Sequence, residues 1–175
     1  SLNSGMMPND IIVQRWMDKK DRSVEFANKG GKMIVSEFYY YYCDYPYGMT
    51  SLKKTYSLDP YIKGLTEAGK KNVYDVECPI WVEYIRDFDK LSYMCFPRFW
   101  AVAEAGWTKR ANMDYNSFEE RFEALRPMLE EMGIKPAPRS DWNPNFLQSL
   151  KELKQFFKGT TNLGNILNMI RNNQA

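Results

Sequence analysis

The fold is decided by residues 10–36, which read DIIVQRWMDKKDRSVEFANKGGKMIVS. The β-branched runs at residues 10–14 and 32–36 each predict a short buried strand. Between them, residues 21–29 predict a short helix, which the glycine pair Gly30-Gly31 ends. A strand, a helix and a strand within about thirty residues form a βαβ unit, so we expect parallel strands and a right-handed crossover.

A long aromatic segment follows at residues 38–60. A loop of this length in a compact domain is usually functional or contains short helices of its own. We expect a short helix at residues 59–65 and a third strand at residues 73–81. Asp75 and Pro79 interrupt the apolar pattern of that strand, which is therefore expected to be irregular.

Two long helices are predicted downstream, at residues 88–107 and at residues 117–132. Pro97 lies inside the first helix, so we expect a kink or a break there. The second helix begins with the capping-box pattern of residues 117–120 and ends at Gly133. Its apolar residues recur at helical spacing, which indicates core packing. These residues are Phe118, Phe122, Leu125, Met128, Leu129 and Met132.

The chain divides into three parts on this pattern. Residues 1–9 contain no basic-then-apolar run, and we interpret them as an artificial or internal boundary. Residues 10–138 form the main α/β unit, which ends at a proline-rich hinge. Residues 139–175 form a helical C-terminal extension, with an amphipathic helix at residues 146–157.

Composition narrows the class of protein. The chain has 175 residues, a hydrophobic content of 44% and a net charge of +2, so we expect a folded domain and no nucleic-acid partner. We find no membrane-spanning stretch and expect no membrane partner. Twelve Tyr and five Trp suit either an aromatic core or the stacking of side chains on sugar rings.

The absence of histidine limits the chemistry. It excludes Ser-His-Asp and Cys-His nucleophilic sites and removes the commonest metal ligand. The three cysteines, Cys43, Cys78 and Cys95, are widely spaced and are interpreted as buried thiols. We therefore expect no metal and no cofactor.

Polar or aromatic side chains follow all three predicted strands. Trp16 follows the first strand, Tyr42 and Asp44 follow the second, and Trp81 and Glu83 lie at the third. In a (β/α)8 barrel the C-terminal ends of the strands build the active site, so this recurrence is typical of a barrel. Two alternatives stay open: both tryptophans could be core residues, and Glu83 could be a solvated carboxylate.

Several motifs resemble one enzyme family. Residues 81–85 read WVEYI, residues 93–98 read YMCFPR and residues 101–108 read AVAEAGWT. In this order they resemble the closing segment of family 20 glycoside hydrolases, the β-N-acetylhexosaminidases. Upstream, VQRW at residues 13–16 and YCDYP at residues 42–46 resemble the family's sixth strand and the Y-L-D-Y motif after its seventh. The resemblance implies about three β/α units from the C-terminal portion of a (β/α)8 barrel.

The resemblance also implies a role for each candidate residue. Trp16 and Trp81 would wall the pocket around the N-acetyl group of an N-acetylhexosamine. Tyr42 would donate its hydroxyl to the acetamido carbonyl oxygen. Asp44 and Glu83 would accept hydrogen bonds from the sugar's 4- and 6-hydroxyls.

The sequence departs from the family pattern at several positions. Cys43 replaces a usual Leu, Val82 replaces a small or hydroxyl residue, and Asp75 stands near a usual Gly. The family's catalytic pair is an adjacent Asp-Glu, used in substrate-assisted retaining hydrolysis, and the chain contains no Asp-Glu dipeptide. We therefore predict that the chain carries no catalytic residue and is inactive alone.

These features leave three functional interpretations. The favoured one is a segment of a β-N-acetylhexosaminidase whose partner is the missing N-terminal half of the barrel. A partial barrel has open sheet edges, so we also expect oligomerisation or strand exchange. The alternatives are a non-catalytic carbohydrate-binding module and a structural fragment without ligand affinity.

Overall fold

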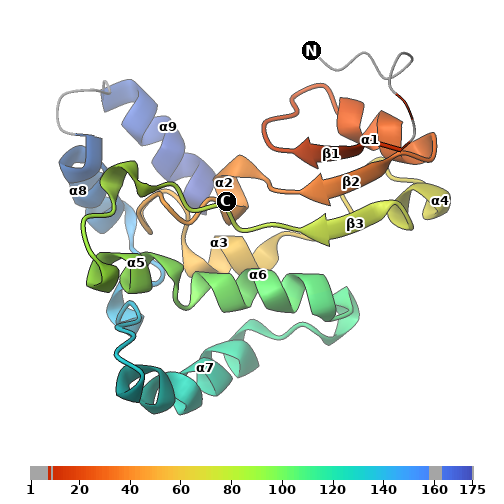
Figure 1. Ribbon diagram of the computed structural model, residues 1–175. Coiled ribbons are helices and arrows are strands. Elements are labelled where there is room, and N and C mark those ends of the chain that lie inside the picture. Colours follow the sequence, from red (N-terminus) through yellow and green to blue (C-terminus); the bar gives the residue numbers. More distant parts are fainter. Residues whose placement is uncertain (1–7, 9, 158–162, 175) are drawn as a thin grey trace.

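The computed structural model describes residues 8, 10–157 and 163–174, and three parallel strands lie at one end of it (Figure 1). The strands are β1 (Ile12–Arg15), β2 (Lys32–Val35) and β3 (Val73–Val76), in the order β1-β2-β3. Ile12 pairs with Lys32, and Ile34 pairs with Asp75. Helix α1 (Arg22–Asn28) connects the first two strands, so the predicted βαβ unit is confirmed.

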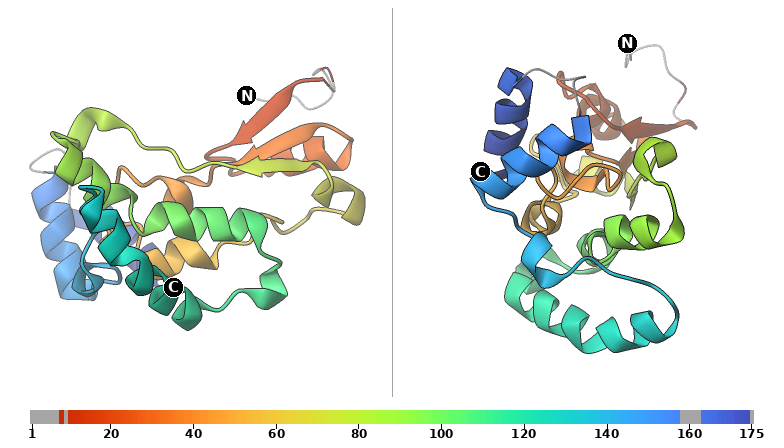
Figure 2. Two further views of the ribbon diagram at one scale, coloured as in Figure 1. Left: turned by 60° about the horizontal axis from the view of Figure 1, so that its bottom comes forward. Right: turned by 90° about the vertical axis from the view of Figure 1, so that its left-hand side faces the viewer.

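Most of the remaining chain is helical. Its elements are α2 (Phe38–Tyr41), α3 (Leu52–Ser57), α4 (Glu67–Lys70), η1 (Val82–Tyr84), α5 (Phe88–Cys95), α6 (Arg98–Trp107), η2 (Arg110–Asn112), α7 (Tyr115–Glu131), η3 (Arg139–Asp141), α8 (Phe146–Phe157) and α9 (Leu163–Gln174). Figure 2 shows α7 as the layer farthest from the sheet, with α6 between them. Within the described residues, no helix has both the length and the apolar character that crossing a membrane requires.

Three clusters of buried side chains hold these layers together. One lies between the sheet and the helices and includes Met33, Val35 and Val102. A second joins α3, α6 and α7 around Trp142. The third, built on Met49, Leu153 and Ile170, packs α8 and α9 against the aromatic segment. The helical extension supplies Trp142, Leu153 and Ile170 to these clusters, so it packs together with the rest of the chain. Burial of each large apolar side chain contributes about 1.5–3 kcal/mol.

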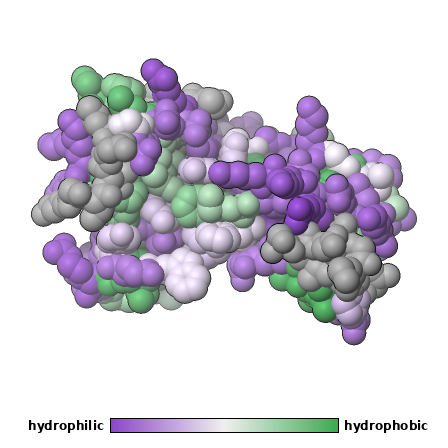
Figure 3. Space-filling model, turned by 90° about the horizontal axis from the view of Figure 1, so that it is seen from above, coloured by the Kyte–Doolittle hydropathy of each residue, from purple (hydrophilic) through white to green (hydrophobic). Residues whose placement is uncertain are grey.

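The two faces of the sheet differ in burial. Val13, Met33 and Val35 are at most 5% exposed and pack towards the helices. Ile12 and Tyr74 lie on the other face and are 46% and 59% exposed. Among the described residues, no strand pairs with the outer edge of β1 or of β3. Apolar side chains also reach the surface in a strip between the two ends of the molecule (Figure 3).

The third strand and the helix before it differ from the prediction. The helix expected at residues 59–65 is wrong; α4 begins after Thr66, whose hydroxyl accepts a hydrogen bond from the Gly69 N–H at 3.0 Å. The strand expected to reach residue 81 ends at Val76. Glu77 still donates its N–H to the Val35 carbonyl at 3.0 Å, and the chain then turns away towards Pro79, which has no N–H to donate.

The predicted break at Pro97 is confirmed, because α5 ends at Cys95 and α6 starts at Arg98. The capping box predicted for the next helix is wrong. Helix α7 begins two residues earlier, at Tyr115, and its cap is Asp114, whose carboxylate accepts a hydrogen bond from the Ser117 N–H at 3.0 Å.

The apolar stripe of α7 is only partly buried. Phe118, Phe122 and Leu129 are at most 4% exposed, as core packing predicts. Leu125, Met128 and Met132 are 42%, 49% and 66% exposed, so the prediction is wrong for them. The helix packs against α3, α6 and Trp142 on one side only, which leaves the far side of the stripe in solvent.

Candidate functional site

A hollow of about 360 Å³ is lined by two segments that follow different strands. One segment supplies Tyr42, Asp44 and Tyr45, which we call the inner wall. The other supplies Trp81, Glu83 and Tyr84, which we call the outer wall. The structure therefore brings together four of the five residues predicted from the sequence: Tyr42, Asp44, Trp81 and Glu83.

The fifth predicted residue, Trp16, adjoins the hollow without lining it. Trp16 directly follows β1, and its ring centroid lies 6.4 Å from that of Tyr42. A short helix, α2, lies between the end of β2 and Tyr42, and an irregular stretch separates β3 from Trp81. The pattern of polar and aromatic residues after each strand thus identified the residues near the hollow. The segments that connect them to β2 and β3 determine how far they lie from the sheet.

The inner wall is held from behind by Arg98, which is 0% exposed. Its guanidinium donates hydrogen bonds to the carbonyl oxygens of Cys43 at 2.7 Å, Tyr45 at 2.8 Å and Thr50 at 3.1 Å. It also donates to the Met94 carbonyl at 2.8 Å. Hydrogen bonds from a charged donor are roughly twice as strong as neutral ones. Arg98 therefore determines the path of the backbone that carries Tyr42 and Asp44.

Arg98 was not predicted to have a role at the site. Its only sequence signal was its place in the YMCFPR motif, which carries no information about side-chain burial. The carbonyls that it binds come from the aromatic segment and from α5, and only the tertiary structure brings them to one point.

The Asp44 carboxyl is nearly buried, at 4% exposed, and its Oδ1 has no hydrogen-bond partner among the described residues. Burial raises the pKa of Asp44 to about 6, with a contribution from the Glu83 charge, against the opposing effects of its own backbone N–H and of Arg98. A buried acceptor without a donor is unusual in proteins. Oδ1 itself is sealed from solvent, but Asp44 also lines the hollow, so a ligand there that donates a hydrogen bond to the accessible part of this carboxylate would be favoured.

Tyr42 is the complementary group, because its phenol can donate a hydrogen bond. Burial and the Asp44 charge raise the pKa of the phenol above its usual value, although a hydrogen bond with Trp81 opposes the shift. The hydroxyl thus stays protonated at neutral pH. A phenol that can donate and a carboxylate that can accept thus lie two residues apart on the inner wall.

The outer wall is far more exposed than the inner one. Trp81 is 59% exposed, and Trp16 at the margin of the hollow is 47% exposed. The interpretation of these two tryptophans as core residues is therefore wrong. The outer wall is held through Tyr84, whose ring centroid lies 4.3 Å from that of Phe156 on α8. Exposed indoles beside a hollow are a common feature of surfaces that take a ligand or partner.

A second polar group at the strand ends was also missed by the sequence reasoning. The Glu77 carboxylate accepts hydrogen bonds from Ser36 Oγ at 2.7 Å and from the Gln14 side chain. Gln14 lies in β1, Ser36 follows β2 and Glu77 follows β3, so one carboxylate joins the ends of all three strands. Its charge also contributes to the raised pKa of Tyr42, after burial and Asp44.

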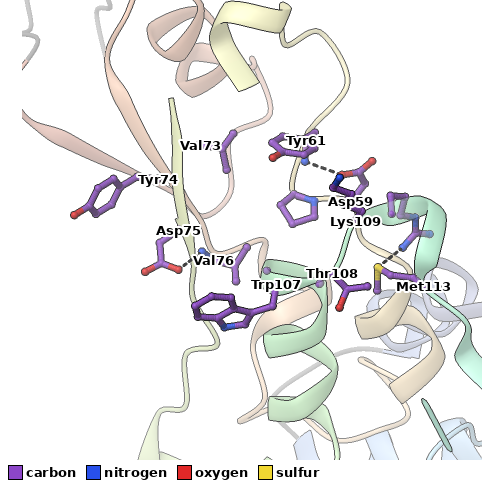
Figure 4. A pocket seen from close by; sticks show the side chains of 14 residues that line it. Asp59, Tyr61, Val73, Tyr74, Asp75, Val76, Trp107, Thr108, Lys109 and Met113 are labelled. Atoms are coloured by element: carbon purple, nitrogen blue, oxygen red, sulfur yellow. Dashed lines mark hydrogen bonds between the residues drawn. The ribbon is translucent and has the colours of Figure 1, made fainter. Parts of the chain in front are cut away.

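Another hollow, of about 230 Å³, runs along β3 and the C-terminal end of α6 (Figure 4). Its carboxylates already accept backbone hydrogen bonds: Asp59 from the Tyr61 N–H at 2.9 Å and Asp75 from the Val76 N–H at 2.7 Å. Trp107, which is 91% exposed, lies at its margin. This hollow follows the open edge of the sheet, and its acidic groups are less available to a ligand than Asp44.

Comparison with known proteins gives one consistent result. Residues 1–110 match the family model described as "Glycosyl hydrolase family 20, catalytic domain". A β-hexosaminidase from Akkermansia muciniphila is 31% identical over 140 residues, which cover 73% of this chain and 28% of that protein. A β-N-acetylhexosaminidase from Cellulomonas fimi is 27% identical over 158 residues, covering 81% of this chain and 31% of that protein.

Solved structures of the same family share the fold. The family 20 β-N-acetylhexosaminidase from Streptomyces coelicolor superimposes with a TM-score of 0.69 at 30% identity, over 81% of this chain and 32% of that one. A Vibrio harveyi exo-β-N-acetylglucosaminidase in complex with N-acetylglucosamine has a TM-score of 0.67 at 20% identity, over 75% of this chain and 22% of that one. The chain thus spans between 22% and 32% of the length of these proteins. It belongs to glycosyl hydrolase family 20, and its three parallel strands and their helices form part of that family's (β/α)8 barrel.

Proposed function

We propose that this chain supplies part of the substrate-binding site of a β-N-acetylhexosaminidase, which removes terminal N-acetylhexosamine from a glycan by substrate-assisted, retaining hydrolysis. One observation carries the proposal: in a member of this family, Tyr42, Asp44, Trp81 and Glu83 line one hollow. A sugar site needs hydrogen-bonding groups beside flat apolar surfaces, and the two walls supply both.

The inner wall would bind the polar groups of the sugar. Tyr42 donates its hydroxyl to the acetamido carbonyl oxygen and holds that oxygen ready to attack the anomeric carbon. Asp44 accepts a hydrogen bond from a sugar hydroxyl at its carboxylate, which lines the hollow. Glu83, across the hollow, accepts from a neighbouring hydroxyl. The protonated phenol and the buried carboxylate are what supports these assignments.

The aromatic residues would enclose the N-acetyl group. Trp81 on the outer wall and Trp16 beside Tyr42 present exposed indoles, which can cover the apolar ring face and the acetyl methyl group. Both indoles are exposed in this chain, as we expect if the remaining walls of the site belong to other parts of the barrel.

Hydrolysis would depend on residues outside this chain. The sequence has no Asp-Glu dipeptide and no histidine, so the chain has no candidate for the family's catalytic pair. We propose that the remaining barrel strands cover the open edges of β1 and β3, and that a second copy covers them when the chain is alone. A clean monomer at micromolar concentration in size-exclusion chromatography would contradict the second part.

A chimeric enzyme tests the proposed function. Residues 10–138 would replace the matching segment of the Akkermansia muciniphila relative, and hydrolysis of a chromogenic N-acetylglucosaminide would be measured. We expect turnover, and a loss of about 100-fold in kcat/KM for Tyr42→Phe, as for removal of one donor at a reacting centre. Tyr61→Phe, at a residue that lies outside the sheet and is 53% exposed, is the matched control.

The outcomes separate the three interpretations. A folded chimera that is inactive, or one that Tyr42→Phe leaves unchanged, contradicts the proposal. Calorimetry of the unmodified chain with N-acetylglucosamine adds a second measurement. Binding that Trp81→Ala abolishes, together with an inactive chimera, would indicate a carbohydrate-binding module. An inactive chimera without any binding would indicate a structural fragment.

A further inference from the structure

Two cysteines that do not line the hollow are in contact with each other. The Sγ atoms of Cys43 and Cys78 lie 2.9 Å apart, although the residues are 35 positions apart in the sequence. Cys43 is 0% exposed and stands between Tyr42 and Asp44 on the inner wall. Cys78 is half-buried and precedes the outer wall by a few residues. The contact therefore joins the chain segments that carry the two walls.

The backbone holds the two cysteines in place without any covalent link. Cys43 donates its N–H to the Pro79 carbonyl at 3.0 Å, and Arg98 donates to the Cys43 carbonyl at 2.7 Å. The Cys78 thiol also lies 3.1 Å from the Tyr41 carbonyl. Cysteines can be joined only where their backbones are already adjacent, and this pair meets that condition.

We propose that Cys43 and Cys78 form an intramolecular disulfide, a covalent modification that ties the inner wall of the hollow to the outer wall. Neither cysteine lines the hollow, so the cross-link leaves its lining residues Tyr42, Asp44, Trp81 and Glu83 in place. This disulfide is a property separate from the proposed function, and its formation does not depend on sugar binding.

A small-molecule disulfide such as glutathione disulfide is the oxidant. Burial and the contact with Cys43 raise the pKa of the Cys78 thiol well above its usual value, so only a small fraction of this thiol is ionised. That thiolate, on the more accessible of the two cysteines, attacks one glutathione sulfur, breaks the glutathione S–S bond and releases one glutathione thiolate. The Cys43 thiolate then attacks the Cys78 sulfur of the mixed disulfide and expels the second glutathione. The two cysteines lose two electrons and two protons, and the oxidant becomes two molecules of glutathione.

The surroundings of Cys43 favour its thiolate in the reduced chain. Burial raises the pKa of its thiol, but the hydrogen bond with Cys78 and the charge of Arg98 outweigh burial and hold the pKa below its usual value. In the second step the Cys78 hydrogen bond is gone, and the charge of Arg98 is the favourable contribution that remains. The third cysteine is different. Cys95 lies at the end of α5, where burial raises its pKa to about 12, and among the described residues no other cysteine sulfur contacts it, so it should remain a thiol. Cys95 is thus an internal control.

Thiol counting on the full chain tests the proposal. The chain would be incubated with glutathione disulfide at pH 8, or with a dithiol reductant, then denatured, alkylated and weighed. The reduced chain should carry three alkyl groups, one for each of its three cysteines. The oxidised chain should carry one, and peptide mapping should recover a Cys43–Cys78 linkage. Cys95→Ala should leave this linkage intact, whereas Cys78→Ala should abolish it.

Three results would overturn the proposal: three alkyl groups after oxidation, a stable glutathione adduct on Cys78, or a linkage that includes Cys95. Cys78→Ala is preferred to Cys43→Ala because Cys78 is only half-buried and its replacement disturbs the packing less. No sugar is present in the assay. The proposed function can therefore fail while the disulfide is found, and the reverse also holds.

Discussion

The inner and outer walls of the hollow differ in how they are held. Tyr42 and Asp44 are 7% and 4% exposed, and the buried guanidinium of Arg98 binds the carbonyls beside them. Trp81 is 59% exposed, and its segment is packed through Tyr84 against α8. This chain by itself therefore fixes the inner wall, while the outer wall is only partly supported.

The sheet shows the same asymmetry. The face with Val13, Met33 and Val35 is buried by helices of this chain, and the face with Ile12 and Tyr74 is exposed. In a closed (β/α)8 barrel the second face would line the interior, which side chains of all the strands fill. Helices of this chain bury one face of the sheet, and we propose that further barrel strands pack against the exposed surfaces.

The largest effect should come from removing the anchor of the inner wall. Arg98→Met leaves several buried carbonyls without their donor and should lower the free energy of unfolding by roughly 3 kcal/mol or more. Urea denaturation measures this value. Arg121→Met is the matched control, because Arg121 forms a half-exposed ion pair with Glu104 and should cost less than about 1 kcal/mol. Equal losses in the two variants would contradict the anchoring role.

The second-largest effect is a pH dependence of the free energy of unfolding that is caused by the Asp44 carboxyl group. Its folded pKa of about 6 lies above the ordinary value of 3.8, so folding disfavours the ionised form. The protonated carboxyl contributes stability below pH about 4, and this contribution is lost as the pH rises through about 6. Asp44→Asn should be more stable than the parent chain at pH 7.5 by roughly 2 kcal/mol, with little difference at pH 4.

Urea denaturation at the two pH values measures this difference. Asp75→Asn, at an exposed aspartate of β3, is the comparison variant. The assignment fails if Asp44→Asn and the parent chain keep the same stability difference at both pH values. Ligand binding should show the opposite dependence: a sugar hydroxyl that donates to the ionised Asp44 binds more tightly above pH 6.

A smaller loss is expected when support is removed from the outer wall. Phe156 packs on Tyr84 with ring centroids 4.3 Å apart and on Tyr45 with centroids 5.8 Å apart. Phe156→Ala should cost roughly 1–2 kcal/mol and speed amide exchange in residues 81–85. Phe88→Ala, at a ring that is 59% exposed, should cost less. If exchange in residues 81–85 is unchanged, α8 does not support the outer wall.

The smallest effect on stability should come from Trp81→Ala. Because the ring is 59% exposed, unfolding should change by no more than about 0.5 kcal/mol. In the chimeric enzyme the same substitution should raise KM by about 10-fold or more, since it removes an aromatic contact of roughly 1–2 kcal/mol. A large loss of stability would instead make Trp81 a packing residue.

The errors of the sequence reasoning have local physical causes. Thr66 was overlooked as a helix cap, so the helix of residues 67–70 was expected too early in the chain. Asp114 competes with Ser117 as the cap of α7, and spacing alone does not decide between them. The third strand was expected to continue through apolar residues that in fact leave the sheet after Val76. Short-range patterns indicate the type of an element better than its ends.

The sequence by itself determined the parallel βαβ unit, the break at Pro97 and the family, because these follow from local periodicity, from the missing N–H of proline and from ordered motifs. It also identified four residues that line one hollow. Only the tertiary structure decided that Arg98 anchors the inner wall, that Asp44 Oδ1 is buried without a partner, and that Cys43 meets Cys78. Burial and contact between distant segments depend on packing of the whole chain, which spacing along the sequence does not encode.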